Sequence, residues 1–79
     1  MASRYQNERR FPRWRELPDG GRHYWLDIAG RRDRWARYNK WVDASETTLL
    51  IVQEIYDADG VLVEVHQKYP EDLGHVRLV

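Results

Sequence analysis

The chain has 79 residues, which is one domain at most, and its formal net charge is zero although 33% of its residues are charged. It contains no cysteine, which excludes disulfides and thiolate metal sites. No apolar run approaches the ~18 residues that a membrane-spanning helix needs. The first fifteen residues are polar and rich in arginine, without the apolar segment of a secretory signal. We therefore expect a cytoplasmic domain that does not enter a membrane.

The zero net charge hides a strong asymmetry along the chain. Residues 1–40 hold eleven Lys and Arg against five Asp and Glu, whereas residues 41–79 hold two against eight. All four tryptophans lie in or at the edge of the basic half, and eleven of the thirteen basic residues are arginine, the better partner for phosphates and aromatic faces. This pattern indicates an anion-binding or nucleic-acid-binding half. Alternatively, the two halves neutralise each other across one sheet or across a dimer.

The N-terminal half contains the weaker structural signals. Residues 1–10 have almost no apolar content and predict a disordered tail, with a single β domain over residues 11–79. Arg13–Leu17 is a candidate first strand, which Pro12 confines to a sheet edge. Arg22–Ile28 is the next strand, and Arg34–Val42 follows with aromatic side chains on both of its faces.

The C-terminal half contains the clearest element, a hairpin. Thr48–Tyr56 and Val61–Tyr69 are rich in β-branched and aromatic residues, and the turn Asp57–Gly60 suits a type I turn with Gly60 in a left-handed conformation. This turn pairs Asp57 with Val61, and regular pairing beyond it sets Ile55 opposite Val63, Gln53 opposite Val65 and Glu54 opposite Glu64. A helix over Ala44–Ile55 is the alternative, but its β-branched residues favour a strand.

The last segment, Pro70–Gly74, predicts one helical turn with proline at its first position. The sequence thus predicts a mainly β fold: an antiparallel meander of four to five strands, forming a curled sheet or partial barrel, with at most one short helical turn. A sheet of this size with almost no helix leaves one of its faces unburied. The sheet must therefore curl, dimerise or be covered by the N-terminal tail of the chain.

Three side chains of the predicted hairpin form a candidate catalytic group, namely Glu54, Glu64 and His66. Facing carboxylates raise each other's pKa, and a nearby imidazole can share the proton, which suits general acid–base work. The alternative is an ordinary solvated face on which Glu64 pairs with Lys68 and Glu54 with Arg37. The spacing of His66, Asp72 and His75 matches no metal motif. We therefore expect neither a metal nor a cofactor.

The candidate binding residues are Arg34, Trp35, Arg37, Tyr38 and Trp41. They alternate cations with rings, and on a β-sheet exposed rings can stack nucleic-acid bases while arginines hold phosphates. The alternative is that the tryptophans form the core, with the arginine stems lying over them.

The C-terminal half also carries a signature that runs Gln53-Glu54-Ile55-Tyr56-Asp57, Gly60, Leu62-Val63-Glu64, His66, Lys68-Tyr69-Pro70, Asp72 and Gly74-His75. With it the chain resembles a family of short bacterial proteins of unknown function over about residues 22–76. This resemblance implies no established activity and assigns no catalytic roles.

Two functions follow from these features. The first is a non-enzymatic β-sheet module, expected to form a homodimer, that binds a protein or a nucleic acid through the half rich in Arg and Trp. The second is a small acid–base hydrolase or ribonuclease-like toxin that uses His66 with Glu54 or Glu64.

Overall fold

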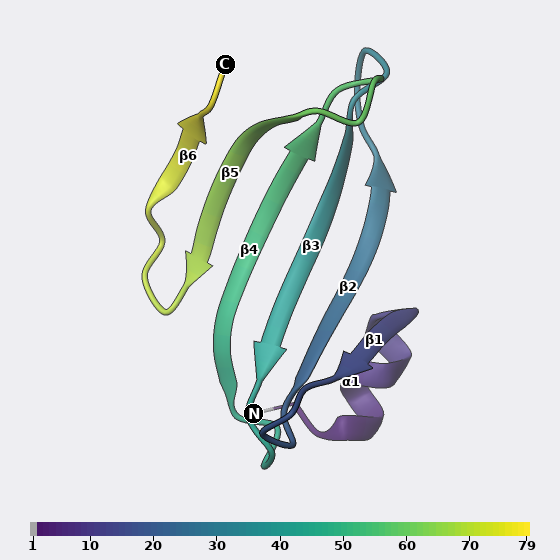
Figure 1. Ribbon diagram of the computed structural model, residues 1–79, viewed down its shortest axis with the longest axis vertical. Helices are drawn as coiled ribbons and strands as arrows, with labels where there is room; N and C mark the ends of the chain where they lie inside the picture. Colours follow the sequence, from purple (N-terminus) through teal and green to yellow (C-terminus); the bar gives the residue numbers. More distant parts are fainter. Residues whose placement is uncertain (1) are drawn as a thin grey trace.

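The computed structural model describes residues 2–79 as one open antiparallel sheet and a short helix (Figure 1). Six strands follow one another across the sheet in chain order, and β1 and β6 form its two edges. The elements are α1 (Arg4–Arg10), β1 (Arg13–Glu16), β2 (Arg22–Ala29), β3 (Trp35–Val42), β4 (Thr48–Tyr56), β5 (Leu62–Tyr69) and β6 (Gly74–Arg77). The prediction of a mainly β antiparallel meander is confirmed, with six strands in place of four or five. The sheet does not close into a barrel.

The sixth strand replaces the helical turn that we expected near Pro70. Leu73 N–H donates to the carbonyl of Gln67 at 2.9 Å, and Gly74 N–H donates to the carboxylate of Asp72 at 3.0 Å. Gly74 takes a φ of 70°, a conformation that favours glycine. These bonds reverse the chain, so residues 74–77 pair with β5 instead of ending a helix.

The structure places residues 4–10 in helix α1, where the sequence predicts a disordered tail. Ser3 and Gln6 form a capping box, because each side chain bonds the backbone N–H of the other at 3.2 and 2.9 Å. The buried residue of this helix is the polar Asn7, so a search for an apolar stripe does not find it. The tail thus covers part of the sheet, one of the three solutions that an open sheet allows.

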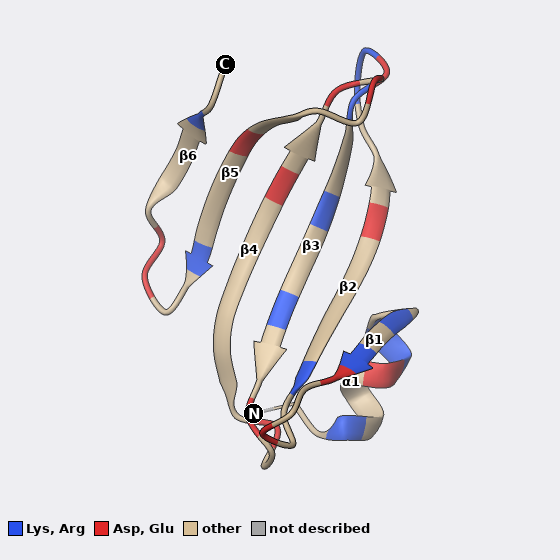
Figure 2. Cartoon of the chain, viewed as in Figure 1, with Lys and Arg blue, Asp and Glu red and all other residues tan. Residues whose placement is uncertain are grey.

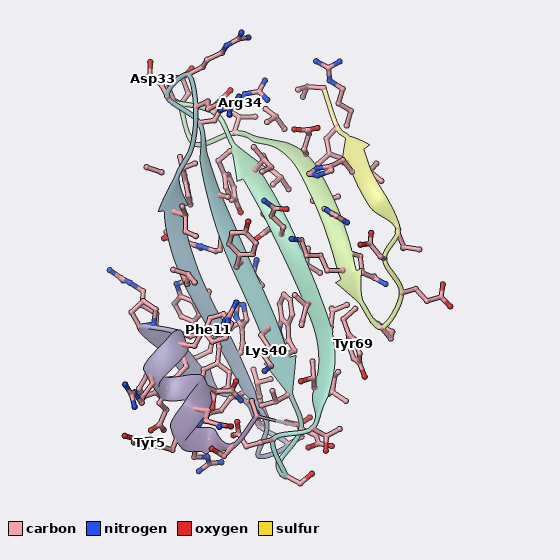
Figure 3. All side chains as sticks on the ribbon, turned by 180° about the vertical axis from the view of Figure 1, so that it is seen from behind. Tyr5, Phe11, Asp33, Arg34, Lys40 and Tyr69 are labelled. Atoms are coloured by element: carbon pink, nitrogen blue, oxygen red, sulfur yellow. The ribbon has the colours of Figure 1, made fainter. Side chains whose placement is uncertain are left out.

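The apolar core is small and lies between α1 and the sheet. Phe11, Tyr24 and Val42 are buried together, with Leu26 packed beside them. Because side chains alternate along a strand, the residues that share a face with Tyr24 form the helix face, and the neighbours of His23 form the open face. Figure 3 shows α1 in front of the lower part of the helix face only.

The turn of the β4–β5 hairpin forms as the sequence predicts. Asp57 pairs with Val61 through an N–H···O bond of 3.0 Å, and Gly60 has a φ of 81°. The predicted register beyond it is wrong, because an irregularity follows at once and shifts the pairing between Ile55 and Tyr56. Ile55 faces Glu64, Gln53 faces His66 and Glu54 faces Val65. The shift moves every following side chain of β5 to the other face.

No helix in residues 2–79 has the length and apolar character to cross a membrane.

Candidate functional site

A layer of rings occupies the open face of the sheet. The imidazole of His23 stacks on the indole of Trp41 with centroids 4.3 Å apart, and Trp35 stacks on Tyr56 at the same distance. Trp25 lies 5.0 Å from His23. These rings come from β2, β3 and β4 and are half-buried by one another. We name His23, Trp25, Trp35, Trp41 and Tyr56 the aromatic face.

Arg37 lies within this ring layer. Its guanidinium is 5.9 Å from the ring centroid of Trp25 and 5.4 Å from that of Trp35, within the range of cation–π attraction. Nε and Nη2 also donate to the two carboxylate oxygens of Asp27, at 2.8 and 3.1 Å. The Asp27 hydrogen bond raises the pKa of Arg37, so this side chain is a permanent cation. Arg37 thus pairs with Asp27, although Glu54 stands opposite it on β4.

A buried amide fixes the orientation of His23. Asn39 is 2% exposed, and its Nδ2 donates to Glu54 Oε1 at 2.7 Å. Its Oδ1 must then accept the bond that joins it to His23 Nε2 at 2.8 Å. His23 therefore carries its proton on Nε2, and burial lowers its pKa. The imidazole of His23 is therefore neutral, and its hydrogen bond to Asn39 holds it in the orientation in which it stacks on Trp41.

Two further arginines border the aromatic face. Arg13 pairs with Trp25 and Arg15 with His23, so both side chains point to the open face from the edge strand β1. Both are exposed, and neither forms an ion pair within residues 2–79. Figure 2 shows Lys and Arg gathered on α1, β1 and β3. The positive half predicted from the sequence therefore includes this margin of the sheet.

The structure brings three of the five candidate binding residues together. Trp35, Arg37 and Trp41 share the open face of the sheet. Arg34 lies just before β3, with Nη1 3.7 Å from Glu64 Oε2. Tyr38 points to the helix face, where its hydroxyl accepts from Gln53 Nε2 at 3.1 Å and the Lys68 ammonium lies 5.1 Å from its ring.

Sequence reasoning missed three members of the ring layer: His23, Trp25 and Tyr56. Each lies in a strand that the sequence predicts. His23 and Trp25 stand two residues apart, so the alternation of the strand already places them on one face. What the sequence lacks is the pairing register that sets them beside Trp41 and Trp35.

The structure separates one of the three candidate catalytic residues from the other two. Glu54 lies on the aromatic face, whereas Glu64 and His66 lie on the helix face. His66 Nε2 bonds Asp72 Oδ1 at 2.6 Å, and this bond lowers the pKa of Asp72. His66 Nδ1 is buried, and its ring lies 4.5 Å from that of His75. The contacts of His66 within residues 2–79 are therefore with Asp72 and His75, at the β5–β6 connection.

Within residues 2–79, no group of three or more His, Cys, Asp or Glu side chains is arranged to hold a metal ion. No protein-family model, curated protein or solved structure matches the chain. The resemblance to a family of short bacterial proteins stays a prediction.

Proposed function

We propose that this protein is a non-enzymatic binding module that holds single-stranded nucleic acid on its aromatic face. The observation that carries the proposal is the layer of stacked rings on an open sheet face. Helix α1 packs on the opposite face, and no other helix is present in residues 2–79. Rings in such a layer offer π-faces and edges to any base that approaches from solvent.

Base stacking supplies the first part of the binding energy. An aromatic side chain contributes about 1–3 kcal/mol for each base that it stacks, with little dependence on base type. In the Trp41–His23 and Trp35–Tyr56 pairs each ring covers one face of its partner, so a base would stack on an outer face of a pair. Asn39 holds His23, and Arg37 lies against Trp25 and Trp35, which lowers the entropy that these rings lose on binding.

Phosphate contacts supply the second part. Arg13 and Arg15 are exposed cations that have no carboxylate partner in the described part of the chain, and they lie at the margin of the ring layer. Arg37 contributes less net charge, because Asp27 neutralises it. The rings require bases that are not paired within a duplex, since only splayed bases can lie on a sheet face. The preferred ligand is therefore a single strand.

The direct test is a titration of the protein with a short single-stranded oligonucleotide, in which the quenching of tryptophan fluorescence reports binding. The variant Arg13→Gln/Arg15→Gln should bind at least tenfold more weakly, since each phosphate contact adds to affinity. The matched control is Arg9→Gln/Arg10→Gln, which removes the same charge from α1. Equal losses in the two variants would show general attraction to a basic surface and would refute binding at the aromatic face.

Two further outcomes would also contradict this proposal. The aromatic face could instead join two copies of the chain, which light scattering would show as a dimer. A dimer that dissociates when Trp25→Glu is introduced would assign the face to self-association. A duplex that competes as well as the single strand would exclude stacking as the basis of recognition.

A further inference from the structure

A broad groove of about 1190 Å³ lies on the helix face, between α1 and the middle of the sheet. Its apolar part includes Phe11, Leu26, Ile28 and Ile51, together with the ring of Tyr38. In Figure 3, Phe11 and Lys40 lie beside the helix, and no helix covers the strands beyond them. The groove is thus distinct from the aromatic face, which lies on the other side of the sheet.

Four cations line this groove: Arg9, Arg10, Lys40 and Lys68. No carboxylate lines it, and none of these four side chains forms an ion pair within residues 2–79. Neutral polar residues, among them Gln6 and Asn7, complete the lining, so all the formal charge on the groove is positive. An apolar surface with such a charge is complementary to a molecule that is apolar along its length and negative at one end.

Lys40 marks where the negative end would lie. This side chain is half-buried, and its Nζ donates to Asn7 Oδ1, a neutral amide oxygen, at 2.8 Å. The nearest buried carboxylate, Glu46, is already bonded by Asn7 Nδ2, the Tyr24 hydroxyl and Arg4 Nε. Burial and the neighbouring Arg10 lower the pKa of Lys40, and the charge of Glu46 opposes them in part. Glu46 reaches Lys40 only through the Asn7 amide, so an anion in the groove would supply a direct counter-charge.

The apolar residues extend away from this cation along β2. Tyr24 stands opposite Lys40, and Leu26 and Ile28 follow on the same face. At ~3.3 Å per residue, the strand covers about 13 Å between Tyr24 and Ile28. Ile28 is 46% exposed, so this apolar strip is open to a ligand. An extended hydrocarbon chain can lie along it.

We propose that this groove binds a fatty-acid anion, with its carboxylate on the Lys40 ammonium and its chain over Leu26 and Ile28. A second copy of this chain does not fit, because a two-fold interface here would bring the four cations against the same four cations. The proposal does not depend on nucleic-acid binding at the aromatic face.

The test is calorimetric titration of the full chain with dodecanoate below its micelle concentration. Acetate provides the head group alone, and dodecyltrimethylammonium provides the chain with the opposite charge. We expect binding of dodecanoate only. Binding of dodecyltrimethylammonium with equal affinity would overturn the proposal, as would the absence of dodecanoate binding.

Two variants separate the head-group contact from the chain contact. Lys40→Met should weaken dodecanoate binding about tenfold or more, since it removes a charged hydrogen bond, while circular dichroism reports that the fold is kept. Ile28→Ser should also weaken dodecanoate binding, whereas Val61→Ser, at a residue of similar exposure that does not line the groove, should not. Unchanged affinity in both Lys40→Met and Ile28→Ser would refute the site. Displacement of dodecanoate by inorganic polyphosphate at equal concentration would refute it in favour of a general polyanion surface.

Discussion

The imidazole of His23 lies flat on the indole of Trp41, with their planes 3° from parallel. This contact buries the imidazole, while Asn39 accepts its Nε2 proton. A second proton would have to sit on Nδ1, which is buried without a hydrogen-bond partner within residues 2–79. The ring layer is therefore built for neutral histidine.

Stability should consequently fall as the solution is acidified. Burial lowers the pKa of His23 in the folded state, so the unfolded chain binds the proton first. The loss should begin near pH ~6.5, the ordinary value of histidine, and continue until the lowered folded-state pKa is reached. Urea unfolding at a series of pH values between about 7.5 and about 5 measures how the free energy of unfolding depends on pH. His23→Gln should flatten this dependence of stability on pH; a dependence that survives in His23→Gln would contradict the assignment to His23.

A second prediction concerns the buried carboxylate that joins α1 to the sheet. Glu46 accepts hydrogen bonds from Asn7 Nδ2 and the Tyr24 hydroxyl, both at 2.9 Å, and from Arg4 Nε at 3.2 Å. Burial alone would raise the pKa of Glu46, but these bonds prevail and lower it. Glu46→Gln should reduce the free energy of unfolding by about 2 kcal/mol, because hydrogen bonds to a buried charged group are strong.

The control for this change is Glu71→Gln, at an exposed carboxylate, which should alter stability by less than ~0.5 kcal/mol. Chemical denaturation of both variants gives the comparison. Equal stability of Glu46→Gln and the natural chain would show that the other contacts of α1, such as Lys40 with Asn7 and Arg22 with Glu8, suffice to hold it.

The fold could be predicted from the sequence where local chemistry determines it. The turn from Asp57 to Gly60 forms as expected, because left-handed glycine and an aspartate side chain specify that turn by themselves. The register of β5 could not be predicted, because the pairing shifts between Ile55 and Tyr56, just beyond the turn, and no residue type in the sequence marks this irregularity. Helix α1 was missed for a similar reason, since a polar residue, Asn7, makes its contact with the sheet.

In the candidate site, too, the features that depend on one strand could be predicted, whereas those that depend on strand pairing could not. Trp35, Arg37 and Trp41 alternate within one strand, so their common face follows from the period of two. The contributions of His23 and Tyr56 depend on how β2 and β4 align with β3, which is a tertiary property. Glu54 and His66 were placed together on a regular register, and the shift in β5 separates them by the thickness of the sheet.

A third prediction uses the close approach of two strand ends. A Cβ added to Gly21 would lie 2.4 Å from the backbone carbonyl oxygen of Val42, which cannot move without breaking the β2–β3 pairing. Gly21→Ala should therefore cost about 3 kcal/mol of stability through overpacking. Gly60→Ala is the comparison, because a Cβ there meets nothing within 4 Å and only the positive φ is unfavourable. The free energy of unfolding of Gly60→Ala should fall by about 1 kcal/mol. Thermal unfolding that ranks Gly60→Ala as the more damaging change would contradict the steric argument.

The last prediction concerns His66, which in this structure ties the β5–β6 connection together. Its Nε2 bonds Asp72 Oδ1, and the same oxygen accepts from Gly74 N–H, the first residue of β6. His66→Ala should therefore increase amide hydrogen exchange in β6, at Val76 above all, while protection in β2 and β3 is unchanged. Asp72→Asn should do the same more weakly, since an amide oxygen can still accept both bonds. If His66 were instead catalytic, purified protein would degrade RNA and His66→Ala would stop this without altering exchange in β6. The two readings thus predict opposite results in the same pair of measurements.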